Sequence, residues 1–155
     1  DKLEHGPILS IDRRYKRRRQ HKTRYRKKPW LIPMDETPKD LIDFLLNPGS
    51  YPEGTTGVSH IETHISHVFL CDDFVYKIKK PVNFGFLDFS TLRKRHFYCR
   101  QEVSLNARLA KDIYLGVQPL FKRKGAYTFV TGAKDRVAEY AVKMRRIPLN
   151  CLLSK

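Results

Sequence analysis

The 155-residue sequence is poor in cysteine and has no long hydrophobic run. Its three cysteines, Cys71, Cys99 and Cys151, are widely spaced and odd in number, so they do not form a disulfide framework. A reduced, cytoplasmic setting is therefore expected. No apolar run approaches the length that spans a membrane, and no signal-peptide pattern occurs. These absences argue against a disulfide-stabilised secreted domain and against a membrane partner.

Acidic residues are also scarce: 16 of them face 31 lysines and arginines, which gives a formal charge of +15. Residues 1–31 hold 12 basic and three acidic residues, a net charge of +9. The remainder holds 19 basic and 13 acidic residues, a net charge of +6. With 41% hydrophobic and 12% aromatic residues, the chain is expected to have a globular body rather than to be disordered. The sequence thus predicts a basic arm over residues 1–33 and a folded domain over residues 38–155.

The N-terminal half of this domain predicts one helix and two strands. Residues 38–47 form a helix that begins at Pro38 and stops at Pro48-Gly49. Residues 61–80 form two strands that are joined at Asp72-Asp73.

The C-terminal half predicts a helix followed by two strands. Residues 90–111 form a helix with Ser90 as its N-cap, and four residues supply apolar positions: Leu92, Phe97, Leu105 and Leu109. Two strands, Ala126–Thr131 and Val137–Met144, follow and turn near Gly132. This order predicts an α+β fold with a mostly antiparallel sheet.

The strand over residues 74–79 places lysines on one of its faces. Because alternate side chains share a face, Val75, Lys77 and Lys79 point to one side and the intervening apolar residues to the other. Lysines on an edge strand protect against aggregation, which is one explanation. The alternative is a phosphate-binding lysine oriented by a carboxylate on the following helix. That helix has one central acidic residue, Glu102, which could also pair with Arg95 or Arg108 or be solvated.

A resemblance extends from about residue 41 to residue 152. It is carried, in order, by Thr63-His64-Ile65-Ser66, Val75-Tyr76-Lys77, Lys80-Pro81-Val82, Gly85-Phe86-Leu87-Asp88-Phe89, Glu102-x-x-x-Asn106 and Asp112-Ile113-Tyr114-Leu115-Gly116-Val117. This stretch resembles the N-terminal part of the aminoglycoside phosphotransferase-like proteins, which are often fused to a P-loop ATPase. That family resembles protein kinases, so the resemblance implies a kinase-like N-lobe, a small antiparallel sheet plus one helix.

The resemblance implies an ATP-binding site in this half-domain. Lys77 would contact phosphate with Glu102 as its helix partner, and Lys79 is the competing candidate. Val75 would line the adenine site. Residues 142–146, with Met144, would form the last strand and the hinge that holds adenine. The hydroxyls of Thr63 and Ser66 would replace the glycines of a phosphate-covering loop, which this chain lacks.

The catalytic part of such a site has no counterpart here. Phosphoryl transfer needs a catalytic-loop Asp, a metal-binding Asn and a second metal-binding Asp. No H-x-D-x-x-x-x-N pattern occurs in the 155 residues. We therefore expect a C-lobe to be absent, the chain to be inactive alone, and Mg²⁺ to bind only where a C-lobe or a partner domain supplies its ligands. The phosphate acceptor is not defined by these residues.

The basic arm supports an alternative function. Its charges are interleaved with aromatic residues, a pattern that suits phosphates and unpaired bases. Residues 13–33 also resemble the arginine-rich segment of IscB-type, transposon-encoded RNA-guided nucleases over about twenty residues. RNA or single-stranded DNA would contact Arg17, Arg18, Arg19, Arg24, Tyr25 and Arg26. The alternatives are a disordered tail that binds any polyanion and a structural fragment whose domain only packs on a partner.

Three weaker signals favour structural roles. His60 and His64 are expected on one face of a strand and His67 on the other, without the further ligands of a metal site. Cys99 is expected to be a small buried residue rather than a nucleophile. Asp88 is expected to cap the helix that begins near Ser90 or Thr91.

Overall fold

The computed structural model describes residues 36–110, 112–132 and 135–147. Its elements are α1 (Lys39–Leu46), a short 3-10 turn η2 (Pro48–Ser50), β1 (Ser59–Glu62), β2 (Ser66–Leu70), β3 (Phe74–Lys79), α2 (Leu92–Asn106), β4 (Tyr114–Arg123), β5 (Ala126–Thr128) and β6 (Arg136–Arg145). The basic arm, with its six nucleic-acid candidates, and Cys151 lie outside the described residues.

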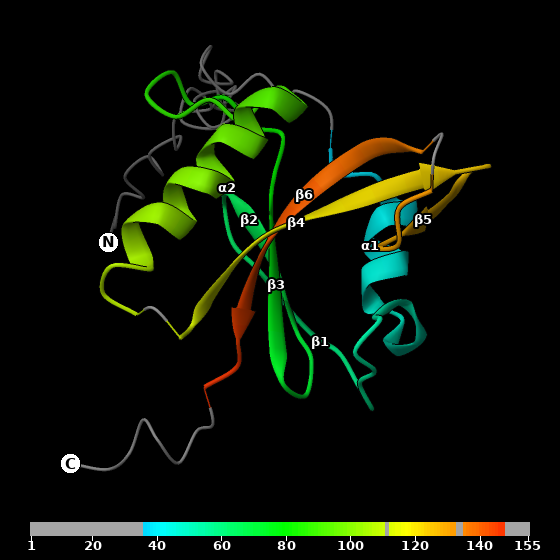
Figure 1. Cartoon of the computed structure of the whole chain (residues 1–155). Helices are drawn as coiled ribbons and strands as arrows, with labels where there is room; N and C mark the ends of the chain where they lie inside the picture. Colours follow the sequence, from blue (N-terminus) through cyan, green and yellow to red (C-terminus); the bar gives the residue numbers. More distant parts are fainter. Residues whose placement is uncertain (1–35, 111, 133–134, 148–155) are drawn as a thin grey trace, which may run out of the picture.

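The strands form one antiparallel sheet in the order β1-β2-β3-β6-β4-β5, which confirms the predicted α+β class. The sheet is strongly twisted, and the two helices lie on either side of it (Figure 1). In the described part of the chain, no helix is both long enough and apolar enough to cross a membrane.

The hydrophobic core lies between α1 and one face of the sheet. Leu41 and Leu45 of the helix pack with the β3 residues Tyr76 and Ile78, which point away from the two lysines. The rings of Tyr51, Tyr76 and Phe129 contact one another with centroids 5.0–5.4 Å apart. This core confirms the predicted helix over residues 38–47, whose apolar residues are spaced to cover a sheet.

The opposite face, which α2 covers, is more polar. The helix begins at Thr91, whose side chain accepts a hydrogen bond from the Lys94 amide, so the prediction of Ser90 as the N-cap was wrong. The residues that α2 buries are Arg95 and Cys99. Arg95 binds Glu139 of β6 through its Nε, 3.0 and 2.9 Å from the two carboxylate oxygens.

Three of the apolar residues expected to anchor this helix are exposed instead: Phe97 by 55%, Leu105 by 60% and Leu109 by 90%. For Phe97 and Leu105 the prediction was wrong because α2 meets a sheet face that carries charged residues, so its polar side turns inward. Leu109 lies beyond the helix, which ends at Asn106 and not at residue 111 as predicted.

The sheet also differs from the prediction in three strands. β1 is separate from β2, because residues 63–65 turn between them. β4 was not predicted, and it pairs with both β5 and β6. Consequently Ala126–Thr128 pairs with β4 rather than forming a hairpin with β6 across Gly132. β4 contains Gly116 and Pro119 and has two irregularities in its pairing with β6, which hide the alternation typical of a strand.

Candidate functional site

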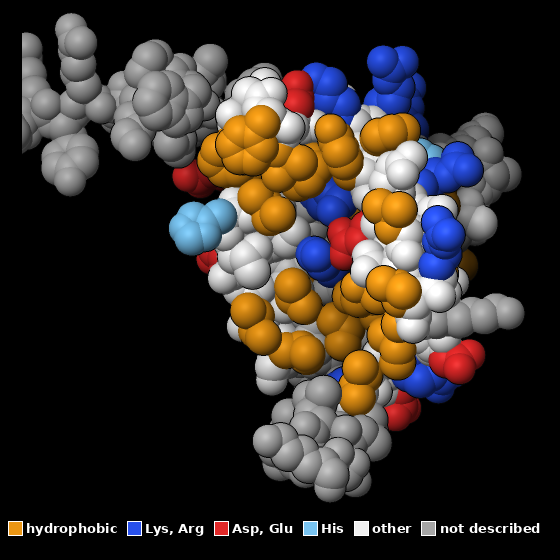
Figure 2. Space-filling model, turned by 90° about the vertical axis from the view of Figure 1, so that its left-hand side faces the viewer, with side chains coloured by type: hydrophobic (Ala, Val, Ile, Leu, Met, Phe, Trp, Pro, Cys, Tyr) orange, Lys and Arg blue, Asp and Glu red, His pale blue; other side chains and the backbone are white. Residues whose placement is uncertain are grey.

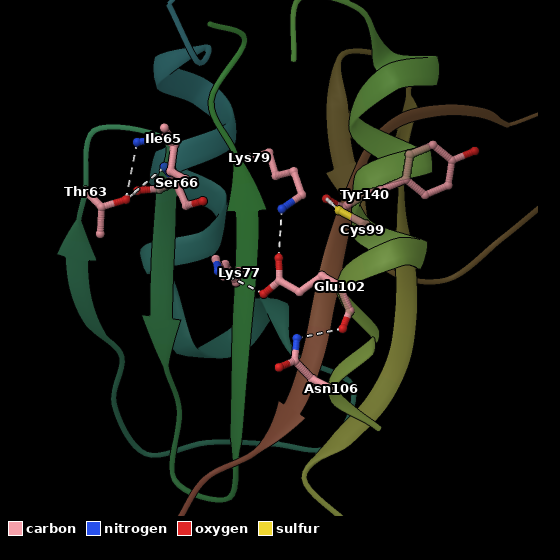
Figure 3. Close-up of polar contacts among 9 residues, drawn as sticks. All are labelled: Thr63, Ile65, Ser66, Lys77, Lys79, Cys99, Glu102, Asn106 and Tyr140. Atoms are coloured by element: carbon pink, nitrogen blue, oxygen red, sulfur yellow. Dashed lines mark hydrogen bonds and ion pairs between the residues drawn. The ribbon is translucent and has the colours of Figure 1, made fainter. Parts of the chain in front are cut away.

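Two lysines of β3 share one carboxylate of α2 (Figure 3). The Lys77 ammonium lies 2.8 Å from Glu102 Oε1, and the Lys79 ammonium lies 2.7 Å from Glu102 Oε2. The predicted ion pair between Lys77 and Glu102 is therefore present, and the alternative pair between Lys79 and Glu102 is present as well. Strand alternation explains why both lysines reach the same helix, since residues two apart on a strand share a face.

The two lysines differ in exposure. The Lys77 side chain is 27% exposed and that of Lys79 is 6% exposed, while the Glu102 side chain is 15% exposed. Burial raises the pKa of Glu102, but the hydrogen bonds and charges of both lysines outweigh it and hold the pKa below its ordinary value. Two ammonium groups and one carboxylate leave this cluster with one net positive charge. An anion can therefore be attracted to it, and Lys77 is the ammonium within its reach.

The cross-strand neighbours of Lys77 are apolar. Val68 of β2 and Val142 of β6 lie directly opposite Lys77 on the neighbouring strands, so they share its face. Val75, predicted to line the adenine site, lies opposite Met144, predicted to belong to the hinge that holds adenine, one step along the same face. Figure 2 shows basic and acidic side chains in the middle of a largely hydrophobic side of the molecule.

Thr63 and Ser66 border the turn between β1 and β2. The Thr63 hydroxyl accepts hydrogen bonds from the Ser66 and Ile65 amides and donates one to the Ser66 carbonyl, so it is engaged within the turn. Ser66 lies opposite Lys79, and its buried Oγ has no hydrogen-bond partner. Of the two hydroxyls, only that of Ser66 has no hydrogen-bond partner in the fold, but it is buried and not exposed to a ligand.

The backbone after Met144 is occupied by internal hydrogen bonds. The Arg145 amide donates to the Ile113 carbonyl, and the Arg146 amide donates to the Asp73 carbonyl. If residues 142–146 were a hinge, these two amides would be expected to bind adenine, but both donate hydrogen bonds within the fold. Asn106, one turn after Glu102, donates its side-chain amide to the Glu102 carbonyl and thereby stabilises the end of α2.

The weaker signals have structural explanations. Arg95 pairs with Glu139 and not with Glu102. Cys99 is fully buried, and burial raises the pKa of its thiol to about 12, which favours the expected structural role. The Asp88 carboxylate accepts hydrogen bonds from the Ser90 amide and hydroxyl just before α2. Because Thr91 is the N-cap, the prediction that Asp88 caps the helix was wrong.

The histidine prediction was wrong in one respect. His60 Nε2 and His67 Nδ1 lie 3.1 Å apart, because the two residues belong to adjacent strands and not to one strand. Within the three described segments, no group of three or more His, Cys, Asp or Glu side chains could hold a metal ion.

The sequence did not predict that Glu102 binds both lysines at once. It also did not predict that the centre of the Phe89 ring lies 4.9 Å from the Lys79 ammonium. The spacing of the lysines on β3 was the available signal for the shared carboxylate. The Arg95–Glu139 pair had no signal, because it joins positions 44 residues apart.

No family model matches the chain, and no solved structure gives a significant match. An 85-residue stretch is 40% identical to the uncharacterized proteins Rv2004c and MT2060 of two Mycobacterium tuberculosis strains (ATCC 25618 / H37Rv and CDC 1551 / Oshkosh) and Mb2027c of Mycobacterium bovis (strain ATCC BAA-935 / AF2122/97). The match covers 55% of the chain but only 15% of the length of each relative. These names state no activity, and none of the matches points to a phosphotransferase or to an RNA-guided nuclease.

Proposed function

We propose that the chain binds ATP through its phosphates at Lys77, as the N-terminal half of an aminoglycoside phosphotransferase-like, small-molecule kinase-like domain. The observation that carries this proposal is the ion pair between Lys77 of β3 and Glu102 of the following helix. Protein kinases use a lysine on the third strand and a glutamate on the next helix in the same way, with the lysine directed at the phosphates. The partly exposed Lys77 side chain and the net positive charge of the cluster suit an anionic ligand.

The apolar residues of the same face support a nucleotide rather than a free phosphate. Val75 and Met144 lie next to each other across β3 and β6, one step along the strand from Lys77. A base can pack on such side chains while its phosphates reach Lys77. The adenine ring is held by these apolar contacts, since the Arg145 and Arg146 amides are already bonded within the fold.

The proposal is tested by calorimetric titration of the whole chain with ATP. Lys77→Ala should weaken binding by at least about tenfold, which is the effect of losing one charge-assisted hydrogen bond of roughly 1.5–3 kcal/mol. The matched control is Lys122→Ala. Lys122 is another strand lysine, on β4, and it is paired with the carboxylate of Asp40 on α1. Equal affinities of Lys77→Ala and the parent chain would refute the site.

Binding is expected without turnover. The sequence contains no H-x-D-x-x-x-x-N pattern, and the described residues offer no group of three ligands for a metal ion. Radiolabelled ATP incubated with the chain should therefore release no phosphate above background. Phosphate release that disappears in Lys77→Ala would show that the chain carries a complete catalytic site.

A second candidate function is nucleic-acid binding by the arm. In the described domain, many basic side chains are neutralised by carboxylates, including Lys80 by Glu62, Lys94 by Asp88 and Lys122 by Asp40. The 12 basic residues among residues 1–31 have only three acidic residues to offset them, which leaves a net charge of +9. This distribution favours RNA or single-stranded DNA as a ligand of the arm rather than of the domain.

A further inference from the structure

Lys77 and Lys79 bind the same carboxylate from different environments. The Lys79 ammonium is enclosed: it bonds Glu102 Oε2, lies 4.9 Å from the centre of the Phe89 ring, and its residue is 5% exposed. A buried ammonium without a counter-charge is strongly unfavourable, so Lys79 cannot leave Glu102 without a large loss of stability. Lys77 reaches solvent and can exchange its partner.

The carboxylate is divided between the two lysines. Lys77 bonds Oε1 and Lys79 bonds Oε2, so the departure of Lys77 leaves the second bond intact. A phosphate that binds Lys77 brings further negative charge toward Glu102. Without a remaining cation, Glu102 would respond by taking up a proton, because nearby negative charge favours the neutral form of a carboxyl group.

We propose that Lys79 is a positioning residue for phosphate binding: it holds the Glu102 carboxylate ionised and against the sheet while Lys77 moves from Glu102 to the ligand's phosphate. The inference rests on the nucleotide site proposed above and deepens it, because it assigns different tasks to two lysines that share one carboxylate. Glu102 then exchanges a partner when the ligand binds, and α2 stays attached to β3 throughout.

The other titratable groups near Glu102 do not take over this task. On its own helix, Cys99 remains a neutral thiol, since burial raises its pKa to about 12. On β6, Glu139 is bound by Arg95. Within the described residues, Lys79 is therefore the cation left to Glu102 once Lys77 is engaged.

The first measurement uses the unmodified chain. NMR signals of the lysine side-chain Cε–Hε groups and of the Glu102 carboxyl carbon are followed during a titration with ATP at pH 6.5. The Lys77 signal should shift strongly, the Lys79 signal should shift little, and Glu102 should stay ionised. A larger shift for Lys79 than for Lys77, or protonation of Glu102 on binding, would overturn the proposal.

The second measurement counts protons. ATP binding is measured calorimetrically in buffers of different ionisation enthalpy for the parent chain, Lys79→Met and the control Lys122→Met. Lys79→Met should take up more protons than the parent, approaching about one more per bound ATP. Lys122→Met should match the parent, and a second change, Glu102→Gln, should remove the extra uptake. A purely structural role of Lys79 would weaken binding without this uptake and would contradict the proposal.

The outcomes separate this inference from the proposed function. If ATP binds no variant and shifts neither lysine in the parent chain, the nucleotide site is wrong. Lys79 is then still tested in the absence of ligand, where Glu102 should titrate at higher pH in Lys79→Met than in Lys77→Met. If ATP binds through Lys77 but Glu102 titrates alike in both variants, only the role of Lys79 is refuted. Should Lys79→Met not fold, Lys79→Arg replaces it and should behave like the parent.

Discussion

Replacing Arg95 by methionine tests how α2, the helix that carries Glu102, is held on the sheet. Arg95 Nε lies 3.0 and 2.9 Å from the two carboxylate oxygens of Glu139, and Nη1 donates to the Phe89 carbonyl at 3.0 Å. Glu139 is only 4% exposed. The Arg95→Met variant therefore leaves a buried carboxylate without its counter-charge.

The expected loss is large. Removing one partner of a buried ion pair costs about 3–5 kcal/mol, a substantial part of the roughly 5–15 kcal/mol that stabilises a domain. For a chain of this size, that corresponds to a fall in melting temperature of about 10 °C.

The loss should depend on pH. Burial raises the pKa of Glu139 above 4.5, and Arg95 opposes this effect. Without Arg95 the native-state pKa rises further above the unfolded value. The penalty of the buried carboxylate is then complete at pH values above the native pKa, and it is relieved as the pH falls toward 4.5. The difference in stability between Arg95→Met and the parent should thus be smaller at pH 5 than at pH 7.

Urea unfolding at the two pH values measures both effects. The double variant Arg95→Met/Glu139→Leu should recover much of the loss, because no buried charge remains unpaired. Lys39→Met, which removes a partner from the exposed pair with Asp43, should change stability little. A loss below about 1 kcal/mol for Arg95→Met, or a double variant no better than the single one, would refute the reasoning.

Three further predictions concern other parts of the molecule. Burial lowers the pKa of His67 from 6.5, so the free energy of unfolding should decrease as the pH falls below 6.5, and urea unfolding of His67→Gln should show a weaker decrease; equal profiles would contradict this. Tyr51→Phe removes a buried 2.6 Å hydrogen bond to the Leu45 carbonyl and should cost about 1–3 kcal/mol in thermal unfolding, whereas an unchanged melting temperature would contradict it. Deleting residues 1–31 should abolish most binding to a labelled single-stranded oligonucleotide and leave ATP binding unchanged. For the whole chain, the logarithm of the oligonucleotide binding constant should fall with the logarithm of the salt concentration with a slope of about −0.7 per neutralised phosphate. Equal oligonucleotide binding by both chains would reject the arm as the binding segment.

Local signals in the sequence predicted the elements that local chemistry determines. Helix α1 begins next to Pro38 and ends next to Pro48-Gly49, as the sequence predicted. Proline and glycine give this signal because they restrict or free the backbone at their own position. The alternation over residues 74–79 placed Lys77 and Lys79 on one face, and the structure confirms it. These features need no knowledge of distant residues.

The features that escaped prediction depend on contacts between distant segments. β4 is recognisable as a strand mainly through its pairing with β6. That pairing extends past Gly116 and Pro119, two residues that are unfavourable in a strand. The inward side of α2 could not be chosen from its own sequence, because the sheet face that it meets carries charged residues. The shared carboxylate likewise requires the register of β3 against α2, which a single sequence does not contain.

The most direct test of the central claim is a crystal structure of the chain with a non-hydrolysable ATP analogue. The account predicts a phosphate oxygen within hydrogen-bonding distance of the Lys77 ammonium, the base against Val75 and Met144, and Glu102 still bonded to Lys79. An analogue bound elsewhere on the domain, with the Lys77–Glu102 ion pair unchanged, would contradict it.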